Sequence, residues 1–177
     1  MTGFVESLFL YEIDTQCRFV LRAEAELNAA LAAALFGGGD VWYPMQALLI
    51  AAADISKLLW GDFDLPEQAQ QRAPLRRLLA VKPNSPLKGR TLRNHAEHID
   101  TRILDVFGAP NAPTIFAGRN VGPYDSLGVR GVPRFFHYDP GKGLLVFGKD
   151  ALSIPAVVGE VRRLAPMAHQ EAQTIRS

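Results

Sequence analysis

The chain has 177 residues, of which 48% are apolar and 21% charged, and its formal net charge is +1. This composition excludes general disorder, and the length suits a single domain over residues 1–177 with a sizeable core. The only cysteine, Cys17, excludes an internal disulfide framework.

The N-terminal residues and the apolar runs bear on export and membranes. Residues 1–14 contain acids where a signal peptide needs a basic start and an uninterrupted apolar core. The longest apolar run, residues 41–53, is interrupted by Gln46 and is too short to span a bilayer. We therefore expect a cytoplasmic protein that does not engage a membrane.

The first predicted element is a long helix over residues 5–36. Ile13, Cys17 and Val20 begin an apolar stripe at helical spacing, and the alanine-rich second half has high helix propensity. The three consecutive glycines at 37–39 end it, because glycine disfavours a helix interior.

A second helix is predicted over residues 41–60, with Asp40 as its cap. Most of its residues are apolar, so it should be the central helix, buried on most sides. Asp54 is one of its only two charged residues. It either pairs with Lys57, three positions away, or reaches a cation on a later helix over residues 85–107.

A third helical segment, residues 66–81, should break or kink at Pro74. It overlaps a basic stretch, residues 68–96, that contains seven cations and no acid, whereas residues 1–67 hold ten acids and three bases. The basic stretch either pairs internally with the acidic first third or attracts phosphate. Its cations are Arg72, Arg76, Arg77, Lys82, Lys88, Arg90 and Arg93.

Residues 85–107 are predicted to form one helix that organises the rest of the chain. Ser85 and Pro86 are typical of a helix start, and Gly108 is typical of an end. One face forms an apolar stripe of Leu92, Ala96, Ile99, Ile103 and Val106. The other face carries Arg90, Arg93, Asn94, His95, Glu97, His98, Asp100, Thr101, Arg102 and Asp105.

After this bundle core (5–107), residues 108–131 are rich in Gly, Pro and Asn and are predicted to be a long ordered loop. Residues 132–147 read as a β-hairpin, and residues 153–173 as the last helix, kinked at Pro166. The predicted fold class is therefore mainly α, an antiparallel helical bundle with a small C-terminal β-hairpin before the last helix.

The sharpest motif is Arg93-Asn94-His95-Ala96-Glu97-His98, which reads Arg-Asn-x-x-x-His. It resembles the signature of the HEPN superfamily (higher eukaryote and prokaryote nucleotide-binding), whose members are helical bundles. Many of them are metal-independent endoribonucleases of toxin–antitoxin and defence systems. The longer run Leu-Arg-Asn-x-x-Glu-His-x-Asp-x-Arg also resembles a bacterial family of unassigned function.

The HEPN resemblance implies roles for three residues. His98 would be the general base or acid at a ribose 2′-hydroxyl, since imidazole titrates near neutral pH. Arg93 would hold the scissile phosphate, and Asn94 would orient the imidazole or the phosphate. The implied product is a 2′,3′-cyclic phosphate, and neither a metal nor a cofactor is implied. The supporting residues would be Asp54, Arg90, Glu97, Asp100 and Arg102.

Helical geometry adds a condition to this interpretation. Five residues of α-helix turn by about 500°, so Arg93 and His98 would lie roughly 140° apart around the axis and about 7.5 Å apart along it. Two such side chains converge on one phosphate more easily when two copies of the helix meet across a two-fold axis. The ribonuclease interpretation therefore predicts RNA as the substrate and a homodimer as the active form.

Two alternatives remain open for the same residues. Arg93 and Glu97 are spaced i, i+4, and a network of Asp54, Arg93, Glu97 and His98 could lock the bundle or bind a cognate protein partner without catalysis. His95 and His98, with Asp105 or Glu97, could instead hold zinc. Residues 118–123 could form either a turn or a backbone nest for an anion.

Overall fold

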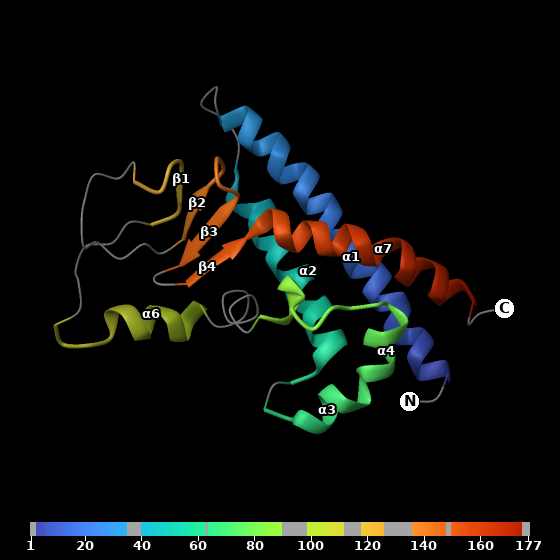
Figure 1. Ribbon diagram of the computed structural model, residues 1–177. Helices are drawn as coiled ribbons and strands as arrows, with labels where there is room; N and C mark the ends of the chain where they lie inside the picture. The colour runs from blue at the N-terminus through green and yellow to red at the C-terminus, as the bar shows by residue number, and fades with distance from the viewer. Residues whose placement is uncertain are drawn as a thin grey trace. The chain divides into compact units, whose positions relative to one another are not determined.

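The computed structural model describes residues 3–34, 40–62, 64–89, 99–111, 118–125, 136–147 and 150–174, with the side chains of Ile99, Arg102 and Val106 excepted. The chain divides into two compact units (Figure 1). We call Met1–Gly89 with Ala156–Ser177 the helical unit, and Arg90–Pro155 the sheet unit. The chain is mainly helical, with a small sheet before the C-terminal helix.

Two long helices dominate the first part of the helical unit. Helix α1 spans Gly3–Ala34 and helix α2 spans Trp42–Trp60, which confirms both predicted helices, and the two pack against each other. Helix α1 buries Leu10, Ile13, Cys17, Val20 and Leu27 along one face. Helix α2 is buried on most sides, as its nearly continuous apolar sequence predicts.

Asp40 and Gly61 fix the two ends of α2. Asp40 Oδ1 accepts hydrogen bonds from the amides of Trp42 (2.9 Å) and Tyr43 (3.4 Å), so the predicted cap is confirmed. Gly61 follows α2 with a φ of 71°, and a Cβ atom there would lie 2.5 Å from the Cβ atom of Gln68. Glycine is favoured at this position, because L side chains rarely adopt so positive a φ.

The predicted break near Pro74 is confirmed. Helix α3, Pro66–Gln71, ends before helix α4, Ala73–Leu78, and Arg72 separates them. Pro74 lies in the first turn of α4, where its missing N–H leaves no helical hydrogen bond unmade.

The prediction of one helix over residues 85–107 is wrong at its start. Ser85 accepts a hydrogen bond from the amide of Leu87 as predicted, but only a single 3₁₀ turn, η1 (Pro86–Lys88), follows. Gly89 is then extended, with φ −65° and ψ 132°. A cap and a proline favour one turn, and glycine's low helix propensity lets the chain leave it.

Helix α6, Ile99–Phe107, is the described part of that predicted helix. It ends where Gly108 donates its amide hydrogen to Leu104 O at 2.8 Å, which confirms the predicted end. Ile103, assigned to the buried stripe, is 43% exposed, so that assignment is wrong. Periodicity identifies an apolar face, but burial also requires an element that covers it.

Helix α7, Ile154–Thr174, confirms the predicted last helix, and it belongs to the helical unit from Ala156 onward. Its stripe of Val157, Val161, Leu164 and Ala168 is fully buried. Pro166 lies inside the helix, which continues to Thr174.

The sheet unit contains four short strands in the order β1-β2-β3-β4. They are β1 (Asn120–Val121), β2 (His137–Asp139), β3 (Leu144–Phe147) and β4 (Asp150–Ser153). Strands β2 and β3 form the predicted hairpin, with an antiparallel pairing that β4 extends. Strand β1 runs parallel to β2 and, like β4, was not predicted. Gly143, with a φ of 59°, closes the hairpin turn.

Candidate functional site

The catalytic candidates Arg93, Asn94 and His98 lie outside the described residues, as do the supporting candidates Arg90 and Glu97. The other three supporting candidates, Asp54, Asp100 and Arg102, lie within them, Arg102 by its backbone alone. The described residues therefore include the segments directly before and after the motif, and the surfaces elsewhere on each unit.

A polar network within the helical unit holds the segment that precedes the motif. Arg163 on α7 donates from Nε and Nη2 to the two carboxylate oxygens of Glu160, both at 3.0 Å, and from Nη1 to Leu79 O at 3.2 Å. Ser85 Oγ donates to the same carboxylate at 3.1 Å. The Arg163 hydrogen bonds, opposed by burial and helped by Ser85, hold the pKa of Glu160 below its ordinary value. This network ties Ser85, the cap of η1, to α7 five residues before Arg90, the first arginine of the polar face.

Helix α6, which belongs to the sheet unit, is the segment that follows the motif. Asp100 is exposed on this helix. Leu104 is 68% exposed on the same helix. Asp100 is thus available to a partner in solution, while its relation to Arg93 and His98 lies outside the described residues.

Two arginines of the basic stretch are used inside the helical unit. Arg76 donates to Leu59 O, at the end of α2, at 2.5 Å and to Ala69 O at 2.8 Å, and its guanidinium lies 6.0 Å from the ring of Trp60. Arg72 lies 5.4 Å from the ring of Phe9. Burial lowers the pKa of both, and the charge of Arg72 lowers that of Arg76 further.

These contacts revise the two alternatives for the basic stretch. The described contacts of Arg72 and Arg76 are with carbonyl oxygens, an amide and aromatic rings, and the carboxylates of the first third are not among them. Arg77, Lys82 and Lys88 are exposed and leave a positive surface before the motif. Such a surface attracts polyanions in general, without selecting any one.

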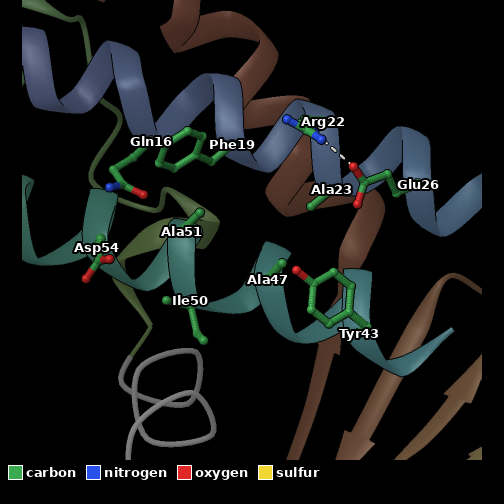
Figure 2. A pocket seen from close by; sticks show the side chains of 10 residues that line it. All are labelled: Gln16, Phe19, Arg22, Ala23, Glu26, Tyr43, Ala47, Ile50, Ala51 and Asp54. Atoms are coloured by element: carbon green, nitrogen blue, oxygen red, sulfur yellow. Dashed lines mark hydrogen bonds and ion pairs between the residues drawn. The ribbon is translucent and has the colours of Figure 1, made fainter. Parts of the chain in front are cut away.

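Asp54 lies in a groove between α1 and α2, which has a volume of about 490 Å³ (Figure 2). Gln16 and Asp54 stand at one end of this α1/α2 groove, and the ion pair of Arg22 with Glu26 (2.9 Å) stands at the other, beside Tyr43. Its complete lining is Gln16, Phe19, Arg22, Ala23, Glu26, Tyr43, Ala47, Ile50, Ala51 and Asp54.

A second polar cluster, which the sequence analysis missed, joins α1 to α7. Asp14, 6% exposed, accepts a hydrogen bond from His169 Nδ1 and forms an ion pair with Arg18 Nη2, both at 3.3 Å. Because the amide of Gln173 donates to His169 Nε2 at 2.9 Å, the Nδ1 atom carries the proton. The sequence does contain a signal for this cluster, because the acidic residue Asp14 interrupts the apolar stripe between Leu10 and Cys17.

Cys17 lies beside this cluster and is fully buried. Burial, with a further contribution from the charge of Asp14, raises the pKa of its thiol to about 12. The thiol is therefore protonated at neutral pH and is a poor nucleophile.

In the sheet unit, two buried side chains hold residues 118–125 against the strands. His137 is fully buried and its Nε2 lies 2.9 Å from Gly122 O, so Nε2–H donates; Nδ1 has no partner among the described residues. Asp139 accepts from the amides of Tyr124 and Lys142, both at 3.1 Å. Burial alone would raise the pKa of Asp139, but these backbone hydrogen bonds outweigh it and lower the pKa.

These contacts also decide how residues 118–123 are built. Residues 118–123 contain strand β1, whereas the sequence predicted either a turn or an anion-binding nest there. The guanidinium of Arg119 lies 5.9 Å from the ring of Phe136. The backbone there is thus part of a sheet, with its arginine placed over an aromatic ring.

Within the described part of the chain, no three His, Cys, Asp or Glu side chains are grouped as metal ligands would be. The zinc alternative at His95 and His98 lies outside that part. None of the described helices combines the length and apolar character that crossing a bilayer requires.

Comparison with known proteins leaves the site to be argued from its own residues. No protein-family model matches the chain, and no curated protein or solved structure is significantly similar to it.

Proposed function

We propose that the chain is a HEPN-like, metal-independent endoribonuclease of the toxin or defence type, which acts on RNA in the cytoplasm as a homodimer. The observation that carries this proposal is the pattern Arg93-Asn94-x-x-x-His98 in a strongly polar segment. The mainly helical architecture and the exposed cations Arg77, Lys82 and Lys88 support it.

The chemistry assigns one proton transfer and one phosphate contact to the motif. His98 accepts the proton of a ribose 2′-hydroxyl while the 2′-oxygen attacks the adjacent phosphorus. The bond from phosphorus to the 5′-oxygen breaks, and that oxygen takes a proton from water to leave as a 5′-hydroxyl, while protonated His98 returns its proton to the resulting hydroxide. Arg93 stabilises the charge on the pentacovalent phosphorus, and Asn94 orients the imidazole. The products are a 2′,3′-cyclic phosphate and a 5′-hydroxyl end.

The direct test compares RNA cleavage by the wild type, His98→Ala and Arg93→Ala. We expect both variants to lose at least about a hundredfold in rate, and the wild type to remain active in EDTA. His95→Ala is the matched control, since this histidine lies in the same segment but outside the Arg93, Asn94 and His98 pattern. Equal background cleavage by wild type and His98→Ala would show the proposal to be wrong, and so would loss of activity only in His95→Ala.

A complementation test addresses the shared site. Arg93→Ala and His98→Ala are mixed after each is found inactive alone. If one copy supplies the arginine and the other the histidine, a mixed dimer contains one intact site, and about a quarter of wild-type activity should return. A mixture with no recovered activity, despite exchange of subunits, would contradict a site built from two copies.

The second candidate function is a non-catalytic helical interaction protein with a cognate protein partner. The observation that favours it is that Arg72, Arg76 and Arg163 all serve internal contacts, so strongly polar residues in this chain are used for packing. In that case the Arg, Glu, His and Asp residues of the polar face would form a structural or partner-binding network. Their variants would change stability or partner binding and leave RNA intact.

A further inference from the structure

Helix α1 carries large apolar side chains on two opposite faces, and on the second face Thr15 lies between Tyr11 and Phe19. Its core stripe is the buried face described above, and a second stripe of Phe4, Leu8, Tyr11 and Phe19 is exposed. At 100° per residue the centres of the two stripes lie about 170° apart, and the exposed stripe is about 22 Å long. A helix of a stable globular unit normally buries one face, so the second stripe calls for a partner.

The exposed stripe continues onto α2 through the α1/α2 groove. Phe19 lines this groove together with Tyr43 and Ile50 of α2 (Figure 2). The six side chains are between 44% and 72% exposed. We call these six residues, with the groove, the α1/α2 face.

The exposed area of this face is large for a monomer. With a full area of about 200 Å² for each large side chain, the six exposed fractions correspond to roughly 670 Å² of surface. That is somewhat more than the largest apolar patch on ordinary monomers, about 300–600 Å². It also approaches the roughly 800 Å² that each partner contributes to a standard interface, before any rim residue is counted.

The shape and charge of the face suit a second copy of itself. An interface with two-fold symmetry must supply both the projecting and the receiving surface from one patch. Here Phe19, Tyr43 and Ile50 project, and the groove between them is lined by three alanines, Ala23, Ala47 and Ala51. The rim carries both signs of charge in Arg22, Glu26 and Asp54, so two copies do not simply repel.

We propose that the α1/α2 face is the surface through which two copies of this chain associate, with Phe19, Tyr43 and Ile50 of each copy packed against the alanine-lined groove of the other. The existence of a homodimer rests on the proposed function, whereas the location of its interface rests on the exposed residues of the α1/α2 face. The shared site of the proposed function requires the same two-fold axis to bring the Arg93–His98 segments together, and the α1/α2 face adds residues of the helical unit to that interface.

The test measures oligomeric state by sedimentation and light scattering, without any activity readout. We expect a dimeric wild type, and Phe19→Glu and Ile50→Glu variants whose dissociation constant rises by about a hundredfold or more, because an unpaired carboxylate would be buried. Leu65→Glu is the matched control, since Leu65 is 42% exposed in the same unit and does not line the groove. It should remain dimeric, and circular dichroism should show that all three variants are folded.

A second measurement keeps the proposal testable if a glutamate variant fails to fold. Single cysteines at Phe19, Tyr43 and Ile50 are treated with a bifunctional maleimide, while the buried Cys17 thiol stays protonated and unreactive. At least one should link two copies, and Leu65→Cys should not.

Several results would overturn the assignment. A wild type that is monomeric at every concentration, or captured only by a different protein, contradicts a second copy as the occupant. A dimer that survives both glutamate variants contradicts this face as the interface. An inactive but face-dependent dimer would contradict the ribonuclease proposal alone, so the two proposals can fail separately.

Discussion

The helical unit and the sheet unit use polar side chains in different ways. In the helical unit, arginines bind carbonyl oxygens on another segment, as Arg163 does with Leu79, and carboxylates on another helix, as Arg162 does with Glu24. In the sheet unit, His137 and Asp139 bind backbone groups of residues 118–125. Long helices satisfy their own backbone except at their ends, whereas two- to four-residue strands leave many groups that need side-chain partners. The helical unit should therefore depend chiefly on its apolar core, and the sheet unit on a few hydrogen bonds.

The largest expected effect comes from the core of the helical unit. Leu48 on α2 is fully buried, so Leu48→Ala should lower the free energy of unfolding by about 2–5 kcal/mol through lost burial and a residual cavity. Chemical denaturation measures the change. Gln46→Ala, at an exposed position of the same helix, should change it by less than about 0.5 kcal/mol, and a comparable loss there would contradict this account.

The Arg163–Glu160 pair should have the next largest effect. Glu160→Gln weakens hydrogen bonds to a charged group and should cost about 1–2 kcal/mol at neutral pH. Because folding lowers the pKa of Glu160, its stabilisation is present above the unfolded pKa of about 4.5 and is lost as pH falls through the lowered folded pKa.

Thermal unfolding of wild type and Glu160→Gln across acidic and neutral pH measures this difference. The gap between their melting temperatures should narrow in acid. Arg162→Ala, which removes a more exposed ion pair with Glu24, should cost less than about 1 kcal/mol. A gap that is independent of pH would show that Glu160 does not act through its charge.

Asp139→Ala tests the sheet unit. The amide of Tyr124 loses the Asp139 carboxylate as acceptor, so its hydrogen exchange should accelerate by about tenfold or more, while amides in the middle of α2 keep their protection. The amide of Lys142 keeps Asp139 O as an acceptor at 3.3 Å and should change less. Amide exchange followed by NMR measures both. Asp125→Ala, on the same exposed loop, is the control. Equal acceleration in both units would remove the contrast between them.

The smallest effect concerns Cys17, which reports on the helical unit alone. Its protonated, buried thiol should react with a disulfide reagent only when that unit opens. Leu48→Ala should therefore speed labelling, and Asp139→Ala should leave it close to the wild-type rate. Rapid labelling of the wild-type protein under native conditions would contradict the burial of this residue.

The sequence predicted those features that depend on local chemistry. Asp40, Pro74 and Gly108 mark real boundaries, because capping, ring geometry and helix termination act within a few residues. The apolar character of α2 predicted its burial for a similar reason, since a helix apolar on nearly all sides must be enclosed.

Features that depend on distant partners were missed. The parallel pairing of Asn120 with His137 joins residues far apart in sequence, and two-residue strands carry no periodicity. The exposure of Ile103 and the early end of the turn at Gly89 depend on what packs nearby. The candidate site itself was identified from its motif alone, and Arg93, Asn94 and His98 remain a prediction from sequence.

The division of the helical unit into two separate stretches of sequence affects how it is made. Glu160 reaches back 75 positions to Ser85, and the buried stripe of α7 completes the core that α1 and α2 begin. On the ribosome, the α1–α2 pair must wait for the whole sheet unit to be translated before α7 emerges to cover it. During that interval the nascent chain exposes apolar surface to the cell, so its yield should depend on chaperones and on the speed of translation through residues 90–155.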